Sequence, residues 1–126
     1  MKREIIQTAL APAAIGPYAQ AVIAGDMVFT SGQIPLDPAT GTMVGDDITE
    51  QTVRVCENLR AVLEAAGSSP EFAVKTTCYL TSMENFTAFN AVYAQYFSTT
   101  PARSCVAVKE LPKGALVEVE VVAVKA

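Results

Sequence analysis

Two strand-like apolar runs near the C-terminus carry charge where a sheet would place apolar or plainly solvent-facing residues. The first run spans residues 101–108 and contains Arg103, and the second spans residues 116–122 and contains Glu118 and Glu120. Burying a charge is costly unless the charge is paired. These positions therefore indicate either a structural ion pair or a site for a charged ligand.

The alternation of strand side chains sorts these residues between the two faces of a sheet. Arg103 shares a face with Cys105, and Glu118 shares a face with Glu120. The opposite face of the glutamate strand is apolar and consists of Val117, Val119 and Val121. We expect the valine face to belong to the core.

The composition suits one domain that spans residues 1–126 and buries apolar surface between subunits. Apolar residues make up 51% of the chain, and the mean hydropathy is +0.30. No run reaches the ~18 apolar residues of a membrane span. No basic segment precedes an apolar stretch in the manner of a secretory signal. The apolar surplus therefore predicts contact between copies of the chain.

Charge and residue usage exclude several classes of function. The net charge is −4 and basic residues do not cluster, which disfavours a nucleic-acid partner. Histidine is absent, which removes Ser-His-Asp and Cys-His catalysis and most zinc sites. No ligand spacing suggests another metal. The three cysteines lack a C-x-x-C spacing, so reduced thiols in the cytoplasm are the expectation, with packing roles for Cys56 and Cys78.

Periodicity predicts eight elements in the order β-β-β-α-β-α-β-β. They cover residues 5–10, 18–24, 27–31, 47–66, 72–81, 82–97, 101–108 and 116–122. Asp47 and Glu50 have capping-box spacing at the start of the first helix, and Gly67 follows its end. Two amphipathic helices cover only one face of a mixed sheet. This pattern predicts an α+β fold whose second sheet face is covered by another copy.

The residues alone leave two interpretations of Arg103 open. It can pair with Glu118 or Glu120 on an adjacent strand, or its rigid two-donor fork can clamp a substrate carboxylate. Alternating glutamates most often form a solvated face, but Val122 and Val124 continue this face, which predicts partial cover. A carboxylate beside an arginine keeps its charge. Such a group can hold a water molecule or take its proton.

Four further residues attract attention without being specific signals. A cysteine nucleophile needs a base, and no histidine supplies one to Cys105, which favours a wall or backbone role. Tyr18 follows a Gly-Pro loop and is typical of an interface or core residue with a bonded hydroxyl. Ser31 and Gly32 close a strand, which is ordinary turn chemistry.

Six motifs in register resemble the RidA (YjgF) family over essentially the whole chain. They are AAIGPY at 13–18, TSGQIP at 30–35, EAAG at 64–67, PARSCV at 101–106, LPK at 111–113 and VEVE at 117–120. The resemblance implies a chorismate-mutase-like α+β fold and a homotrimer with inward-facing sheets and a cleft at each subunit boundary. It implies hydrolysis of 2-iminopropanoate and 2-iminobutanoate, reactive products of pyridoxal-phosphate dehydratases, to 2-keto acids and ammonia. It implies no metal and no organic cofactor.

The resemblance also implies roles for single residues. Arg103 matches the carboxylate-binding arginine, and Glu118 matches the glutamate that positions or activates water. Tyr18 and Ser31 match polar residues that line the cleft. Two more positions match places where the backbone approaches ligand or water, namely Gly32 and Cys105.

This chemistry does not need a histidine. One cation holds the substrate carboxylate, and one carboxylate orients the water that attacks the C=N carbon. The segment 96–100 is shorter than in many relatives, which bears on cleft shape and substrate range. Two rival functions remain: a non-catalytic regulator that binds small carboxylates in the same cleft, and a ribonuclease, which the acidic charge and the missing histidine disfavour.

Overall fold

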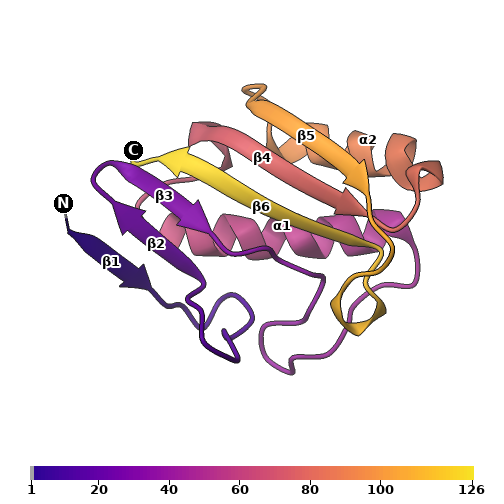
Figure 1. Ribbon diagram of the computed structural model, residues 1–126, viewed down its shortest axis with the longest axis horizontal. Helices are drawn as coiled ribbons and strands as arrows, with labels where there is room; N and C mark the ends of the chain where they lie inside the picture. The colour runs from indigo at the N-terminus through magenta and orange to yellow at the C-terminus, as the bar shows by residue number, and fades with distance from the viewer. Residues whose placement is uncertain (1) are drawn as a thin grey trace.

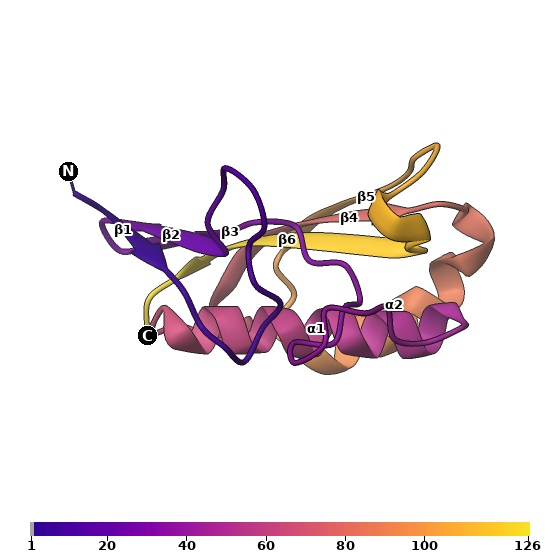
Figure 2. The same cartoon turned by 90° about the horizontal axis from the view of Figure 1, so that it is seen from below.

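The computed structural model describes residues 2–126 and shows one six-stranded sheet with both helices on the same face (Figures 1 and 2). The strands are β1 (Arg3–Ile6), β2 (Ala21–Ala24), β3 (Met27–Thr30), β4 (Ala73–Leu80), β5 (Ala102–Ala107) and β6 (Val117–Val124). The helices are α1 (Ile48–Ala65) and α2 (Phe86–Tyr96). The predicted α+β class, the order of the eight elements and the one-sided placement of the helices are confirmed.

The sheet has the strand order β1-β2-β3-β6-β4-β5, so the last strand of the chain lies in its interior. β4 and β5 are parallel, and α2 provides the crossover between them. Every other neighbouring pair is antiparallel. β1 and β5 form the two edges, and β5 bonds only to β4 within the described chain.

The first strand ends earlier than its apolar pattern predicts. It stops at Ile6, because the buried amide of Gln20 takes over the hydrogen bonds of the loop that follows. Oε1 of Gln20 accepts from the Thr8 amide at 2.7 Å, and its Nε2 donates to the Pro12 carbonyl at 2.7 Å. A side chain therefore replaces a strand partner here and turns the chain away from the sheet.

Helix α1 begins and ends where the sequence predicts. The Asp47 side chain accepts from the Glu50 amide at 2.8 Å and caps the helix. Gly67 has a φ of 78° just beyond the C-cap, a conformation that glycine adopts without a Cβ penalty. The face of α1 toward the sheet is fully buried at Val55, Leu59 and Val62.

Helix α2 begins later than predicted because its first turn is a separate 3-10 helix, Met83–Asn85. Ser82 caps this turn, and its Oγ accepts from the Glu84 amide at 3.1 Å. Aromatic rings line the buried side of α2: the ring of Tyr93 lies 5.5 Å from that of Phe89 and 4.7 Å from that of Phe97. These rings hold α2 against the sheet.

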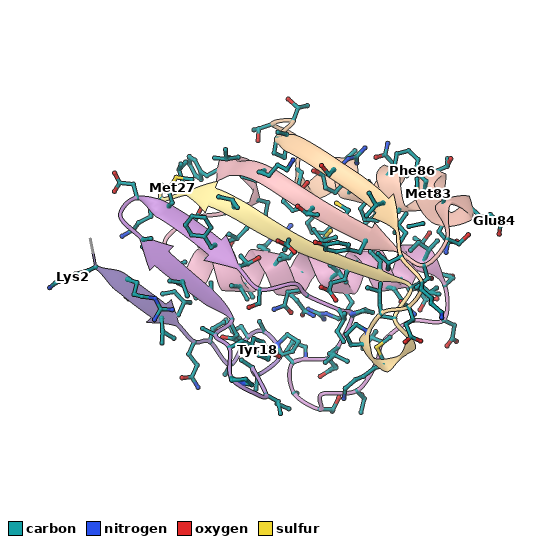
Figure 3. The ribbon with its side chains drawn as sticks, viewed as in Figure 1. Lys2, Tyr18, Met27, Met83, Glu84 and Phe86 are labelled. Carbon is teal, nitrogen blue, oxygen red and sulfur yellow. The ribbon has the colours of Figure 1, made fainter. Side chains whose placement is uncertain are left out.

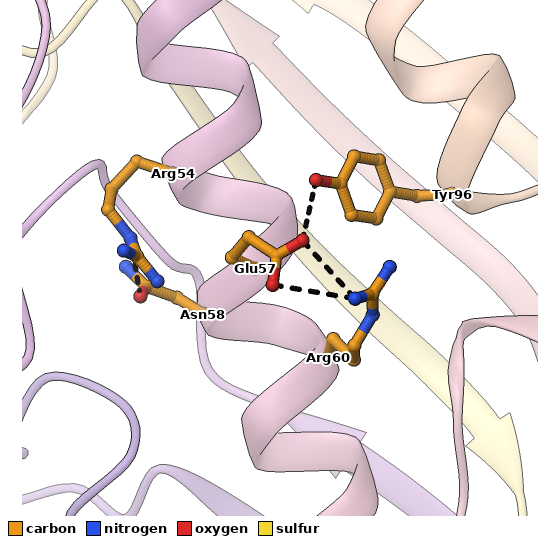
Figure 4. A network of polar contacts seen from close by, with 5 residues as sticks. All are labelled: Arg54, Glu57, Asn58, Arg60 and Tyr96. Carbon is orange, nitrogen blue, oxygen red and sulfur yellow. Dashed lines mark hydrogen bonds and ion pairs between the residues drawn. The ribbon is translucent and has the colours of Figure 1, made fainter.

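A polar network joins the exposed sides of α1 and α2 (Figure 4). The Tyr96 hydroxyl donates to Oε2 of Glu57 at 2.6 Å, and Arg60 pairs with the same carboxylate at 3.3 Å. Burial, together with the bond to Glu57, raises the pKa of Tyr96 to about 12. The phenol therefore stays protonated and keeps donating over the physiological pH range.

The two faces of the sheet differ as the alternation predicts. Val117, Val119 and Val121 are at most 1% exposed and pack in the core beneath the helices. On the opposite face the apolar side chains of Phe29 and Val106 are 45% and 46% exposed, and neither helix covers this face (Figure 2). No helix within residues 2–126 is long and apolar enough to cross a membrane.

Leu59→Ala should lower the free energy of unfolding by about 2–5 kcal/mol, because it opens a cavity in a fully buried site. Val53→Ala on the same helix, where the side chain is 40% exposed, should change it by no more than ~0.5 kcal/mol. Urea denaturation at one protein concentration measures both values. Equal losses in the two variants would contradict this assignment of the core face.

Candidate functional site

Arg103 lies on the edge strand β5, and its side chain points to the helix side of the sheet. Its Nη1 donates to Oδ1 of Asn90 on α2 at 2.6 Å. Its guanidinium carbon lies 4.8 Å from the ring centre of Tyr93 and 5.5 Å from that of Phe86. One neutral amide and two aromatic faces thus fix the guanidinium while most of its five donors remain available to a ligand.

Arg103 does not pair with a carboxylate within residues 2–126, where the one ion pair is between Arg60 and Glu57. Of the two interpretations of Arg103 that the sequence leaves open, pairing with Glu118 or Glu120 within the chain is therefore wrong. β4 lies between β5 and β6, so the arginine and glutamate strands are not neighbours. The side chains also leave the sheet on opposite faces.

A hollow of about 530 Å³ opens beside the guanidinium. Asn90, Tyr93, Phe97 and Thr100 line it together with Arg103. Thr100 has a φ of 55°, a strained conformation for a β-branched residue, and such residues concentrate at functional sites. The short segment before Pro101 thus forms part of the wall beside the cation.

Glu118 forms the second group of the site, on the face of β6 turned away from the helices. Gly32 lies directly against it, and a Cβ added to Gly32 would collide with the Glu118 carboxylate. The segment is held there because the Gln33 amide donates to the Val119 carbonyl at 2.9 Å and the Val119 amide donates back at 3.2 Å. Because Gly32 has no Cβ, its backbone can lie against the Glu118 carboxylate.

Partial burial, and secondarily the charge of Glu120, raise the pKa of the Glu118 carboxyl. Glu120 itself accepts a hydrogen bond from the Tyr79 hydroxyl at 3.0 Å. Arg103 does not lie beside Glu118 within the described chain, so no arginine charge opposes this rise there. A carboxylate of raised pKa is a better proton acceptor at neutral pH than an ordinary one.

Ser31 and Tyr18 come from segments that lie together. The Ser31 hydroxyl donates to the Ala19 carbonyl at 2.5 Å, and its amide donates to the Gln20 carbonyl at 2.9 Å. Tyr18 is 54% exposed on the loop before β2, well separated from Phe86 at the start of α2 (Figure 3). Ser31, Gly32 and Glu118 are therefore contiguous, and Tyr18 projects from the neighbouring loop.

Cys105 shares the helix-side face with Arg103 and is partly buried against the core. Burial raises the pKa of its thiol, and the nearby Arg103 charge opposes this only in part. A mainly protonated thiol without a neighbouring base fits a wall of the site better than a nucleophile that attacks the substrate. That the Cys105 backbone approaches a ligand or water stays a prediction.

The structure brings the predicted residues into two groups rather than one. Arg103 and Cys105 lie on the helix side at the β5 edge, and Ser31, Gly32 and Glu118 lie on the open side. No group of three His, Cys, Asp or Glu side chains suited to a metal occurs among the described residues. Within one chain the predicted site residues therefore form two separate groups.

Sequence reasoning missed Asn90, which holds the arginine. In the sequence Asn90 looks like an ordinary polar residue on an amphipathic helix. Its contact with Arg103 becomes visible only in the structure. A signal does exist: Asn90 is four residues after Phe86 and three before Tyr93, so all three share one helix face. This face of α2, with one amide and two aromatic side chains, is the face that contacts the Arg103 guanidinium.

Comparison with known proteins agrees with the motifs and the fold. The family model described as Endoribonuclease L-PSP matches residues 8–125. A RutC family protein of Synechocystis is 54% identical over 98% of each chain. The chain belongs to the RidA/L-PSP family.

Two other members of the RidA/L-PSP family have more specific descriptions. A protein of Salmonella typhimurium named 2-iminobutanoate/2-iminopropanoate deaminase is 48% identical over 95% of this chain and 96% of its own length. The crystal structure of E. coli TdcF with bound serine has a TM-score of 0.93 and 45% identity, covering 98% of this chain and 99% of that one. The names within the family thus differ, while the fold is shared.

Gly32→Ala should destabilise the protein by about 1–3 kcal/mol, because the new methyl group overlaps the Glu118 carboxylate. In a Glu118→Ala background the same change should cost clearly less, since the overlapping atoms are gone. Denaturation of the four proteins forms a double-mutant cycle that isolates this contact. An identical cost in both backgrounds would refute the close approach.

The carboxyl pKa of Glu118 should lie above the usual glutamate value in an NMR titration of labelled glutamates, because burial disfavours the charged form. Glu120→Gln removes a like charge and should lower that pKa. Glu110→Gln, an exposed change elsewhere in the chain, is the matched control and should leave it unchanged. A rise in the Glu120→Gln variant would contradict the electrostatic account.

Proposed function

We propose that this protein hydrolyses 2-imino acids such as 2-iminobutanoate and 2-iminopropanoate to 2-keto acids and ammonia. The observation that carries the proposal is the state of Arg103. Its guanidinium is held by Asn90 and two rings, and no carboxylate neutralises it within residues 2–126. A fixed cation with free donors matches the carboxylate that every 2-imino acid carries.

The proposal includes a homotrimer with a cleft at each subunit boundary. Arg103 and Glu118 leave the sheet on opposite faces, so one chain does not bring both to one small molecule. A second copy, packed against the open face, places the Glu118 group of one protomer opposite the Arg103 group of the next. The exposed Phe29 and Val106 support burial of this face between protomers.

In this cleft the substrate carboxylate binds the Arg103 fork, and Asn90 keeps the fork in place. Glu118 orients a water molecule toward the C=N carbon and accepts its proton as the C–O bond forms. That proton passes to the nitrogen, the hydroxyl group of the resulting carbinolamine gives up its own proton to the nitrogen as the C=O bond forms, the C–N bond breaks, and ammonia and the 2-keto acid leave. General-base assistance of this kind contributes ~10²–10⁴-fold. Ser31 and Tyr18 supply further hydroxyls to the cleft, and the reaction uses no metal or organic cofactor.

Two other functions suggested by relatives are weaker. The family description names an endoribonuclease, but a net charge of −4 disfavours binding to RNA phosphates, and without histidine the chain lacks the familiar acid–base residue of RNA cleavage. A Lactococcus lactis relative, 49% identical, is named a regulator. A regulator would use the same arginine to bind a small carboxylate and would lack the hydrolytic step.

Arg103→Ala should abolish the acceleration of imine loss, because the substrate loses its carboxylate partner. The assay generates 2-iminobutanoate from threonine with a dehydratase and follows its decay with and without this protein. Arg60→Ala is the matched control, since Arg60 is already paired with Glu57 on α1. Light scattering should show the same oligomer for all variants.

Wild-type rates in the Arg103→Ala variant would overturn the clamp. Binding of 2-ketobutyrate without any acceleration of imine decay by the wild-type protein would instead favour the regulator.

A further inference from the structure

Two of the three cysteines lie side by side on the parallel strands β4 and β5. Cys78 and Cys105 are register partners, and both face the helices. Neighbouring strands lie roughly 4.8 Å apart, which falls within the usual Cα separation of disulfide-bonded cysteines. Both thiols are free in this structure.

The bond between them would be strained and therefore reversible. Side chains in register on parallel strands point the same way, so their Cβ atoms stay about as far apart as the strands. A disulfide needs a Cβ separation of about 3.8 Å. β5 is an edge strand that is hydrogen-bonded only to β4. It can therefore move closer to β4 without breaking bonds to another strand. Strained disulfides are the readily reduced ones.

We propose that Cys78 and Cys105 form a reversible disulfide when the protein meets a hydroperoxide, with Cys105 as the thiol oxidised first. The Cys105 sulfur attacks the peroxide, the O–O bond breaks, and Cys105 becomes a sulfenic acid as water or an alcohol leaves. The Cys78 sulfur then attacks the Cys105 sulfur, the S–O bond breaks, and the hydroxide leaves as water with the proton of the Cys78 thiol. The peroxide is reduced and the two thiols are oxidised together.

The different exposure of the two cysteines determines which of them is oxidised first. Cys105 is partly exposed, whereas Cys78 is fully buried and is reached only through its neighbour. Burial raises the pKa of both thiols, that of Cys78 to about 12, and the Arg103 charge opposes the rise at Cys105 only in part, so the order of the two steps rests on exposure. Cys56 lies on α1 at 1% exposure and has no register partner.

The disulfide would sit two residues from Arg103 on the same face of β5. Oxidation would thereby act on the strand that carries the proposed carboxylate clamp. The inference itself rests on strand register and exposure, and it holds whether or not the protein hydrolyses imines.

Peptide mapping of the full chain tests the proposal. The protein is treated with hydrogen peroxide, alkylated in denaturant and digested with trypsin, which places Cys78 in peptide 76–103, Cys105 in 104–109 and Cys56 in 55–60. We expect 76–103 joined to 104–109, with a mass lower by two hydrogens than the sum of the two, and loss of this species with dithiothreitol.

Variants keep the test specific. Cys56→Ser should form the link as the wild type does, and Cys78→Ser should leave Cys105 free to oxidise to sulfinic acid. Three results would each overturn the proposal: Cys105 oxidised to sulfinic acid in the wild type with Cys78 still alkylated, a Cys105–Cys105 link between copies, or a link that requires Cys56.

Discussion

Burial of one side of β6 determines the direction in which every candidate residue points. Val117, Val119 and Val121 pack beneath the helices, and this fixes Glu118 and Glu120 on the opposite face. A register shift of one residue would bury both glutamates and expose the valines, at a cost no nearby cation offsets. Because β6 lies between β3 and β4, the same strand also receives Gln33 and so brings Gly32 against Glu118.

The arginine half of the site depends on a different contact. β4 separates β5 from β6, so Arg103 sits at the sheet edge, where α2 supplies Asn90 and two aromatic rings. An amide orients the guanidinium without neutralising it, whereas a carboxylate would compete with an anionic ligand. The chain therefore presents a prepared cation on one side and a carboxylate of raised pKa on the other. In the proposed account a neighbouring copy brings them together.

Much of the fold was predictable because it depends on local periodicity. The helix repeat after Asp47, the alternation in 117–121 and the one-sided helices all follow from spacing, and the structure confirms them. The sequence left open whether Arg103 pairs with a glutamate, because spacing gives the face of a residue within its strand and not the order of strands in the sheet. Asn90 was missed for a related reason: its function depends on which strand packs against α2.

The central claim is that each working site combines Arg103 of one protomer with Glu118 of another. Mixing the Arg103→Ala and Glu118→Gln proteins, each inactive alone, and reassembling them together tests it directly. A site shared around a trimer predicts recovery of about one quarter of wild-type imine hydrolysis at equal mixing, because random assembly pairs the two intact halves at that frequency. Activity that never exceeds the sum of the separate parents would contradict the account.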